Sequence, residues 1–401
     1  MRQMLVHGNK ETLETAIVHE GRLIDFDMEK NDGARQVVGS LYKGRVINVL
    51  PGMQAAFVDI GLVKNAFLYI DDVLHPHLER QPKEKPPINE LLRPGQELIV
   101  QVVKEPIGNK GARVTTHYSL PGRFLVYMPE ADYVGVSKKI QNEQERERLR
   151  SAGVALCRDG EGIILRTAAD GESSSSLRRD VEILRAMWSE INSRSAQVSA
   201  PAELHRDASL SHRIVRDFLT VEIDEVLIDD RLRYKETKTL VGQMAPSMLP
   251  RLKLYEQRDD LFKQYRIYAQ LKEAFERRIR LSCGGDLVWD TTEALTVVDV
   301  NTGRFVGTSD LEDTVFRTNM EAAEQLARLL RLRDIGGIII VDFIDMELEE
   351  HREEVLKRLE SLARLDRTKC QIVGWTRLGL LEITRKKARD HALMMKSINH
   401  S

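Results

Sequence analysis

Two apolar segments that each end in an aspartate constrain the fold of this 401-residue chain more than any other feature. Residues 294–299 read Ala-Leu-Thr-Val-Val-Asp, and residues 336–342 read Gly-Gly-Ile-Ile-Ile-Val-Asp. Between them, apolar residues at helical spacing predict a helix from about residue 312 to residue 331. A strand–helix–strand unit returns the chain in the same direction. We therefore expect a parallel or mixed sheet covered by helices.

Asp299 and Asp342 are the candidate metal ligands. Parallel strands would place both carboxylates near one edge of the sheet, where α/β proteins bind ligands. Mg²⁺ takes one or two carboxylates together with water and substrate phosphate, and it activates water for attack on a phosphodiester. Asn301 points to the same side as Asp299 in an extended segment and is a candidate for orienting the scissile phosphate. The alternative is that both aspartates only cap loops at strand ends.

Short β segments punctuated by turn residues predict a small closed barrel of the OB type. They cover residues 41–50, 54–60, 66–70, 97–104 and 112–118. The Pro- and charge-rich insert at residues 76–94 is expected to be a mobile loop.

Two phenylalanines and a lysine in the barrel segment are candidates for stacking bases and pairing with a phosphate. Phe57 and Phe67 would stack bases if they lie on the outward face, at about 1–3 kcal/mol per base. Lys110, in a glycine-flanked turn, would pair with a phosphate. The alternative is that both phenylalanines belong to the barrel core.

Residues 119–200 are predicted to form a separate α/β unit, followed by a Ser- and Ala-rich linker at residues 193–202. Arg166 and Thr167 close an apolar strand there, and a guanidinium with a hydroxyl can grip a terminal phosphate. The alternative is an ordinary surface arginine. Further along, we expect a long helix over residues 259–280, and a solvated helix face carrying the basic run 385–389.

Composition excludes some classes of protein without deciding the function. The 60 basic and 62 acidic residues leave a net charge of −2, a mild argument against RNA binding, although local clusters decide such sites. The three cysteines lie far apart, and the sequence has neither an apolar run of membrane-spanning length nor a secretory signal. These features predict a cytoplasmic protein. The sequence contains no Gly-x-Ser-x-Gly, P-loop or His-Glu-x-x-His motif.

The segment around the first aspartate, residues 284–303, resembles the catalytic signature of the ribonuclease E/G family. Further segments resemble the family's motifs in the same order along nearly the whole chain: Tyr42-Lys-Gly-Arg-Val, Ile107-Gly-Asn-Lys-Gly, Ile164-Leu-Arg-Thr-Ala, Thr318-Asn-Met-Glu-Ala-Ala, Val341-Asp-Phe-Ile-Asp-Met and Gly379-Leu-Leu-Glu-Ile-Thr-Arg.

The resemblance implies a multidomain α/β and β architecture. Residues 1–35 and 201–275 would form an RNase H-like domain without an active site of its own. Residues 36–118 would form the OB-type RNA-binding domain and residues 119–200 a 5′-sensor domain. Residues 276–401 would form a DNase I-like catalytic domain.

The resemblance also implies roles for single residues. Asp299 and Asp342 match the catalytic aspartates that bind Mg²⁺, for which Mn²⁺ substitutes, and Asn301 matches the phosphate-positioning asparagine. The RNA contacts would be Phe57, Phe67 and Lys110. The pocket for a 5′-monophosphate would comprise Gly122, Val126, Lys138, Arg166, Thr167 and Lys369. Lys138 and Lys369 stand where arginine is expected, so charge is kept and bidentate geometry is lost.

The function that the resemblance implies is hydrolysis of single-stranded RNA by an endoribonuclease, in mRNA decay and rRNA or tRNA processing. The products would carry 5′-phosphate and 3′-hydroxyl ends. The alternative is a catalytically weak RNA-binding or ribosome-assembly factor. No Cys-Pro-x-Cys pair follows Cys370, so zinc is not expected. A homodimer is compatible with the sequence, and the family's tetramer is doubtful.

Overall fold

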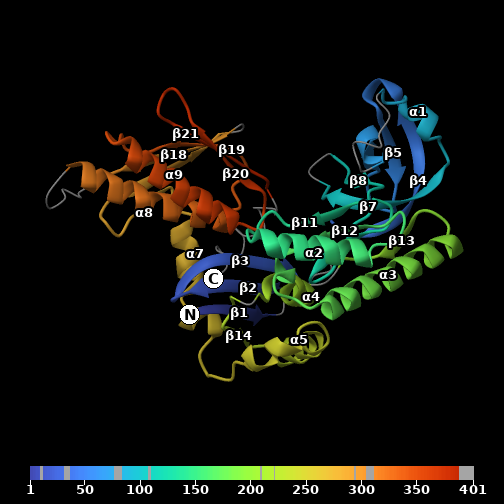
Figure 1. Cartoon of the computed structure of the whole chain (residues 1–401), viewed down its shortest axis with the longest axis horizontal. Helices are drawn as coiled ribbons and strands as arrows, with labels where there is room; N and C mark the ends of the chain where they lie inside the picture. The colour runs from blue at the N-terminus through green and yellow to red at the C-terminus, as the bar shows by residue number, and fades with distance from the viewer. Residues whose placement is uncertain are drawn as a thin grey trace. The chain divides into compact units, whose positions relative to one another are not determined.

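The computed structural model describes residues 1–9, 12–30, 37–75, 84–106, 110–207, 210–220, 222–292, 295–303 and 311–387. The chain divides into two compact units. The first comprises residues 1–31, 221–235 and 250–401, and the second comprises residues 32–220 and 236–249. Each unit contains two β-sheets (Figure 1). The first segment of the chain thus joins much later residues. The five predicted domain segments, with their boundaries, stay predictions.

The first sheet of the first unit combines the N-terminal strands with two later ones. Its order is β15-β14-β1-β2-β3, in which β1 runs antiparallel to β2 and parallel to β14. This arrangement is compatible with the predicted RNase H-like domain. The strands are β1 (Arg2–Gly8), β2 (Thr12–His19), β3 (Arg22–Lys30), β14 (Glu225–Ile228) and β15 (Leu252–Leu254). The helices after β14 are α5 (Arg231–Met244), α6 (Leu261–Gln264) and α7 (Ile267–Ala274).

The prediction of one long helix over residues 259–280 was wrong. The helical segment is interrupted between α6 and α7 by Arg266, whose φ of +52° is left-handed. A left-handed residue cannot continue a right-handed helix. The last predicted turn is instead the strand β16 (Arg278–Arg280), which pairs with β17 (Asp286–Thr291).

The second sheet of the first unit is mixed, with the order β16-β17-β18-β19-β21-β20. β18 and β19 pair in parallel, as predicted, and the pairs on either side of them are antiparallel. The predicted helix between them is α8. The remaining elements are β18 (Leu295–Asn301), α8 (Leu311–Leu332), β19 (Gly337–Asp342), α9 (Glu349–Arg364), β20 (Cys370–Trp375) and β21 (Leu381–Arg385).

Alternation along β18 and β19 separates a core face from an open face. Val298 and Val341 are fully buried and share one hydrophobic core with Leu326 of α8 and Leu359 of α9. The neighbouring aspartates, Asp299 and Asp342, are exposed. Because successive side chains of a strand point to opposite faces, the helices pack against one face and the carboxylates lie on the other.

The second unit contains the predicted five-stranded barrel. Its strands follow the order β4-β5-β6-β8-β7, and a further β4–β7 pairing closes the ring. β13 (Ala202–His205) joins β4 from outside. The barrel strands are β4 (Leu41–Leu50), β5 (Ala55–Asp59), β6 (Ala66–Tyr69), β7 (Glu97–Lys104) and β8 (Arg113–Thr115).

The described part of the insert at residues 76–94 contains regular structure. Residues 84–94 contain the helical turn α1 (Ile88–Leu91). Ile88 and Leu92 are buried in the barrel core at 0% and 2% exposure. Burial of these two side chains anchors the end of the insert, which the prediction of a mobile loop overlooked.

The other sheet of the second unit has the order β11-β12-β10-β9. The predicted linker at residues 193–202 was wrong in its first half, because the preceding helix continues to Gln197 on a face anchored by buried Val181, Leu184 and Ile191. The strands are β9 (Leu120–Pro121), β10 (Leu125–Met128), β11 (Val134–Val136) and β12 (Gly162–Leu165). The helices are α2 (Glu143–Leu156), α3 (Ser174–Gln197) and α4 (Leu210–Arg213), with a π-helical turn at Ile214–Phe218 and 3₁₀ turns at Pro51–Met53, Ile70–Asp72, Thr167–Ala169 and Pro246–Arg251.

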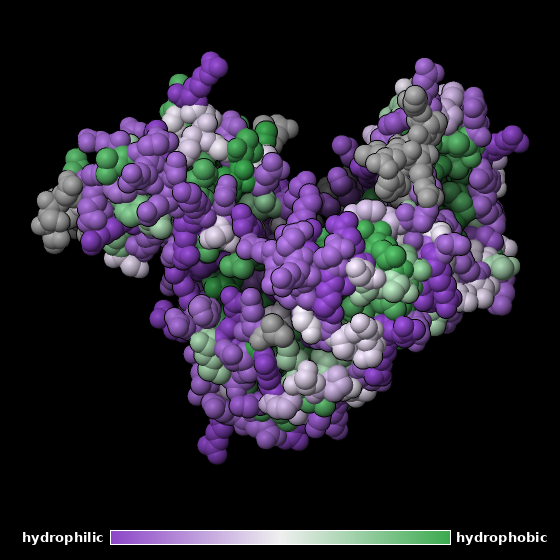
Figure 2. Space-filling model, in the orientation of Figure 1, coloured by the Kyte–Doolittle hydropathy of each residue, from purple (hydrophilic) through white to green (hydrophobic). Residues whose placement is uncertain are grey.

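The hydrophilic surface in Figure 2 is interrupted by smaller hydrophobic areas. In the part of the chain that the structure describes, no helix combines the length and the apolar character that crossing a bilayer requires. Cys157, Cys283 and Cys370 are free thiols.

The basic run at residues 385–389 is not the expected helix face. Arg385 is the last residue of β21 and is buried at 6% exposure. Its guanidinium donates hydrogen bonds to Asp334 Oδ1 and Asp366 Oδ2, both at 2.8 Å. Arg389 lies outside the described residues. Burial of one cation between two carboxylates ties β21 to the segments that follow α8 and α9.

Replacing Arg385 by methionine is expected to destabilise the first unit by about 3–5 kcal/mol, because two buried carboxylates lose their counter-ion. Burial alone would raise the pKa of Asp366, but the hydrogen bond and charge of Arg385 lower it below its usual 3.8. This stabilisation is therefore present above pH 3.8 and lost as the pH falls through the lowered pKa. Urea unfolding at neutral and acidic pH measures both effects.

The matched control is Arg377→Met, which removes an exposed arginine and is expected to change stability by less than about 0.5 kcal/mol. Equal stability of the two variants at neutral pH would contradict the role of Arg385.

Candidate functional site

The two candidate metal ligands face each other across one parallel strand pair. Asp299 of β18 and Asp342 of β19 are direct register partners. Both are exposed, while Val298, Val300 and Val341 beside them are buried. The hydrophobic alternation that orients the valines toward the core therefore also aims both carboxylates at the open face.

A cavity of about 280 Å³ opens at these carboxylates. Asn301 also lines it and donates a hydrogen bond from Nδ2 to Asp299 Oδ2 at 2.8 Å, so the predicted same-side placement is confirmed. Burial and the negative charges of Asp299 and Asp345 raise the pKa of Asp342. The lining residues are Asp299, Val300, Asn301, Thr302, Asp342, Phe343, Ile344 and Asp345.

The donor set of this cavity fits a hard cation that keeps part of its water shell. Within the described ranges, no group of three or more His, Cys, Asp or Glu side chains is arranged to hold a metal. Two adjacent carboxylates suit Mg²⁺, which usually takes one or two carboxylates and completes its shell with water and substrate phosphate.

A buried asparagine of α8 holds the loop that follows Asp342. Asn319 is 0% exposed. Its Nδ2 donates to the carbonyl oxygen of Ile344 at 2.8 Å, and its Oδ1 accepts from the Ile344 amide at 3.2 Å. This reciprocal pair fixes the backbone between Asp342 and Asp345, so α8 both covers the sheet and positions the site.

Phe57 and Phe67 lie on the outer face of the barrel and not in its core. They are register partners on β5 and β6, and each alternates with buried residues. Their ring centroids are 5.6 Å apart in an edge-to-face arrangement. The alternative that both belong to the core is therefore wrong.

A third aromatic residue, Tyr69, extends this pair and was missed by sequence analysis. Its ring centroid is 4.4 Å from that of Phe67, and it is 39% exposed. Arg113 lies over the Tyr69 ring at 5.1 Å, held by two hydrogen bonds to Asp72 at 2.8 and 3.0 Å. The available signal was its position two residues after Phe67, on the same face of a strand.

Lys110 is exposed and precedes β8, the strand that pairs with β6. The next residue, Gly111, approaches the carbonyl oxygen of Asn65 so closely that a Cβ would lie 1.9 Å from it. Only glycine fits this contact, which places the backbone of Lys110 at the end of the aromatic strand pair.

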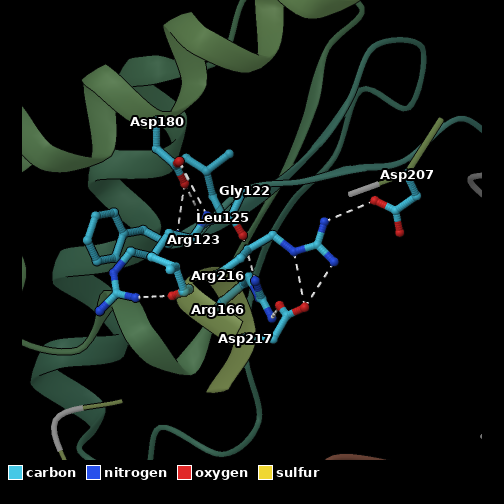
Figure 3. A network of polar contacts seen from close by, with 10 residues as sticks. Gly122, Arg123, Leu125, Arg166, Asp180, Asp207, Arg216 and Asp217 are labelled. Carbon is cyan, nitrogen blue, oxygen red and sulfur yellow. Dashed lines mark hydrogen bonds and ion pairs between the residues drawn. The ribbon is translucent and has the colours of Figure 1, made fainter. Parts of the chain in front are cut away.

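Two of the candidate 5′-phosphate residues, Gly122 and Arg166, meet at the end of β12 (Figure 3). Arg166 donates from Nη1 to the carbonyl oxygen of Gly122 and from Nη2 to Asp217 Oδ1, both at 2.5 Å. Thr167 Oγ1 lies 3.1 Å from Ser137 Oγ, beside the exposed Lys138.

The two remaining residues of the predicted pocket are less directly involved. Val126 lies on β10 opposite Ile164. Lys369 belongs to the first unit, immediately before β20, so the geometry of the second unit does not include it.

A buried carboxylate shapes the loop that carries Gly122. Asp180 of α3 accepts hydrogen bonds from the backbone amides of Arg123, Phe124 and Leu125, at 3.3, 2.8 and 3.2 Å (Figure 3). A Cβ on Gly122 would lie 2.5 Å from Asp180 Oδ2. Burial raises the pKa of Asp180 although these amides oppose the shift.

Known proteins resemble this chain over nearly its whole length. The family model described as "Ribonuclease E/G family" matches residues 119–388. Ribonuclease G of Escherichia coli (strain K12) is 43% identical over 394 residues, which cover 97% of this chain and 80% of that protein. The chain belongs to the ribonuclease E/G family. Ribonuclease G of Haemophilus influenzae is 41% identical over 97% of this chain and 80% of its own length.

The similarity extends to the other branch of the ribonuclease E/G family over a smaller share of that protein. Ribonuclease E of Escherichia coli (strain K12) is 37% identical over 392 residues, which cover 96% of this chain and 37% of the relative. In this ribonuclease E/G family member, Asp345 lines the cavity, Tyr69 extends the aromatic pair and Asp217 contacts Arg166; the sequence analysis singled out none of these three residues.

Gly122→Ala is expected to destabilise the second unit by about 1–3 kcal/mol, because the new methyl group overlaps a carboxylate fixed by three amides. Thermal unfolding measures the loss. The control is Gly52→Ala, where a Cβ meets no atom within 4 Å. Equal melting temperatures for the two variants would show that the Asp180 loop is not tightly packed.

Proposed function

We propose that this endoribonuclease hydrolyses single-stranded RNA with Mg²⁺ held by Asp299 and Asp342, and that Mn²⁺ substitutes. The observation that supports this most directly is the register pairing of the two exposed carboxylates beside one cavity. When bound, the ion polarises the scissile phosphodiester and lowers the pKa of a coordinated water. Asp345, which also lines the cavity, supplies further negative charge, which favours a dication at this place.

The residues of the chain orient the reactants. Asn301 hydrogen-bonds to Asp299 Oδ2, which restrains that carboxylate and leaves the amide beside the cavity to orient a phosphate. Attack of water on phosphorus with departure of the 3′ oxygen leaves 5′-phosphate and 3′-hydroxyl ends. No protein side chain forms a covalent intermediate in this scheme.

The outer face of the barrel is the proposed RNA-binding surface. Phe57, Phe67 and Tyr69 form an edge-to-face row. Lys110 supplies positive charge at the end of the strand pair, and Arg113, paired with Asp72, lies over the Tyr69 ring. Exposed aromatic rings stack on unpaired bases, and cations pair with the backbone. This combination favours single-stranded RNA over a duplex, whose bases are already stacked.

The end of β12 is the proposed 5′-monophosphate pocket. Arg166 and Thr167 offer a guanidinium and a hydroxyl, Gly122 and Val126 form the adjacent backbone, and Lys138 adds a nearby charge. Lys369 is proposed as a further contact of the RNA end. We propose that the enzyme works in the cytoplasm, where it takes part in mRNA decay and in rRNA and tRNA processing.

Asp299→Asn and Asp342→Asn are each expected to abolish cleavage of a fluorescent single-stranded RNA in Mg²⁺, because an amide cannot replace an anionic ligand. EDTA should stop the wild-type reaction. Asp313→Asn is the matched control, since it removes a carboxylate on α8 that pairs with Arg317. Tight binding of RNA by the wild-type chain without any cleavage would instead identify an RNA-binding factor.

Tyr69→Ala is expected to weaken binding of single-stranded RNA by about 1–3 kcal/mol, that is about 5- to 150-fold, through loss of one stacking ring. Tyr69→Phe keeps the ring and should bind normally. Fluorescence anisotropy in EDTA measures affinity without cleavage. Tyr133→Ala removes an exposed tyrosine outside the barrel and serves as the control; a loss of the same size there would refute a specific role for Tyr69.

A further inference from the structure

The carboxylate of Asp217 lies between two guanidinium groups in the pocket at the end of β12 (Figure 3). Its Oδ1 accepts from Arg166 Nη2 at 2.5 Å. Its Oδ2 accepts from Arg216 Nε and Nη2 at 3.1 and 2.9 Å. The side chains of Arg166 and Asp217 are 27% and 22% exposed, whereas Arg216 is only 9% exposed.

This arrangement means that Arg166 already has an anionic partner before any ligand binds. Arg216 also donates to Asp207 Oδ1 at 3.1 Å, so two arginines are balanced by two aspartates. An incoming phosphate therefore meets no excess positive charge from these four side chains. It gains the full attraction of Arg166 only if Asp217 gives up its contact.

The geometry allows that exchange without leaving a buried charge alone. Asp217 would keep both bonds from Arg216 through Oδ2 after losing Arg166. Arg166 would stay attached to the Gly122 carbonyl through Nη1. Release of the Arg166–Asp217 contact thus frees one edge of the Arg166 guanidinium, while the bonds from Arg216 to Asp217 and from Arg166 to Gly122 are kept.

We propose that Asp217 is an internal counter-ion that a terminal 5′-monophosphate must displace from Arg166, and that it thereby sets the selectivity of the pocket. A phosphate monoester carries a charge of about −1.5 to −2 at neutral pH and three acceptor oxygens. One of its oxygens can therefore take the place of the Asp217 carboxylate oxygen that contacts the Arg166 guanidinium. An internal phosphodiester has one charge, and a 5′-hydroxyl has none, so neither competes as well. This inference rests on the proposed 5′-end recognition.

Asp217 stays ionised at the near-neutral pH at which RNA is handled, so it competes with a phosphate for Arg166. Burial alone would raise its pKa, but the charges and hydrogen bonds of Arg216 and Arg166 lower it below the usual value. The groups facing it are these two arginines, with Asp207 on the far side of Arg216.

The test is binding of a 3′-labelled single-stranded RNA with either a 5′-monophosphate or a 5′-hydroxyl, using the full chain in EDTA. Asp217→Asn removes the competing charge at nearly constant shape. It should tighten binding of the monophosphate RNA by about tenfold and leave the hydroxyl RNA unchanged. Asp217→Ser removes the charge by a different side chain and should act in the same direction. Thermal melting confirms that each variant is folded.

Two controls isolate the mechanism. Asp207→Asn removes a carboxylate that accepts from Arg216 rather than from Arg166, and it should not tighten binding. In an Arg166→Ala background, Asp217→Asn should have no effect, because the released cation is missing.

The outcomes separate this inference from the function on which it rests. A gain limited to the monophosphate RNA supports the counter-ion role, even if the wild type discriminates weakly. Wild-type preference for the monophosphate with an unchanged or weaker Asp217→Asn variant overturns it and makes Asp217 a positioning residue. Equal binding of both RNAs by wild type and variant alike overturns 5′-end recognition together with the counter-ion role.

Discussion

The parallel pairing of β18 with β19 is the constraint on which the aspartate-bearing sheet of the first unit depends. It places Asp299 opposite Asp342, and the buried valines on either side leave both carboxylates only one direction in which to point. The same pairing requires a crossover, which α8 supplies, and α8 returns a buried amide, Asn319, to hold the loop after β19. The cluster of carboxylates at the cavity is thus supported by an apolar core and by hydrogen bonds between neutral groups.

The region around the end of β12, which we propose binds a 5′-phosphate, follows a different rule, in which buried charges are compensated inside the protein. Asp180 is satisfied by three backbone amides, and Asp217 by two arginines. Desolvated charges are stable only with such partners. Because Arg166 is already paired with Asp217, the proposed recognition of a phosphate would be an exchange of partners. The two candidate sites therefore differ in their electrostatics: carboxylates that repel one another line the first, and ion pairs line the second.

Much of the fold follows from the spacing of apolar residues along the sequence. The barrel strands, the two aspartate-bearing strands and α8 each have a periodicity that matches one structure only, and they were predicted within a few residues. The errors arose where a single residue or a distant contact overrides the pattern. Arg266 adopts a left-handed conformation that ends α6 within an otherwise helical stretch. Arg385 sits in a basic run that looks solvated, yet its partners Asp334 and Asp366 come from other segments of the first unit.

The sequence by itself determined the family, the strand–helix–strand unit and the identity of the carboxylates, because these are written in contiguous motifs and in alternating burial. The tertiary structure alone decided which polar groups become neighbours. Arg113 lies over the Tyr69 ring because β8 pairs with β6 in the barrel, and Asp345 lines the cavity at the end of the loop that Asn319 holds. Asp217 meets Arg166 across 51 positions of sequence. Pairings of this kind depend on how the chain closes on itself, and no local periodicity encodes them.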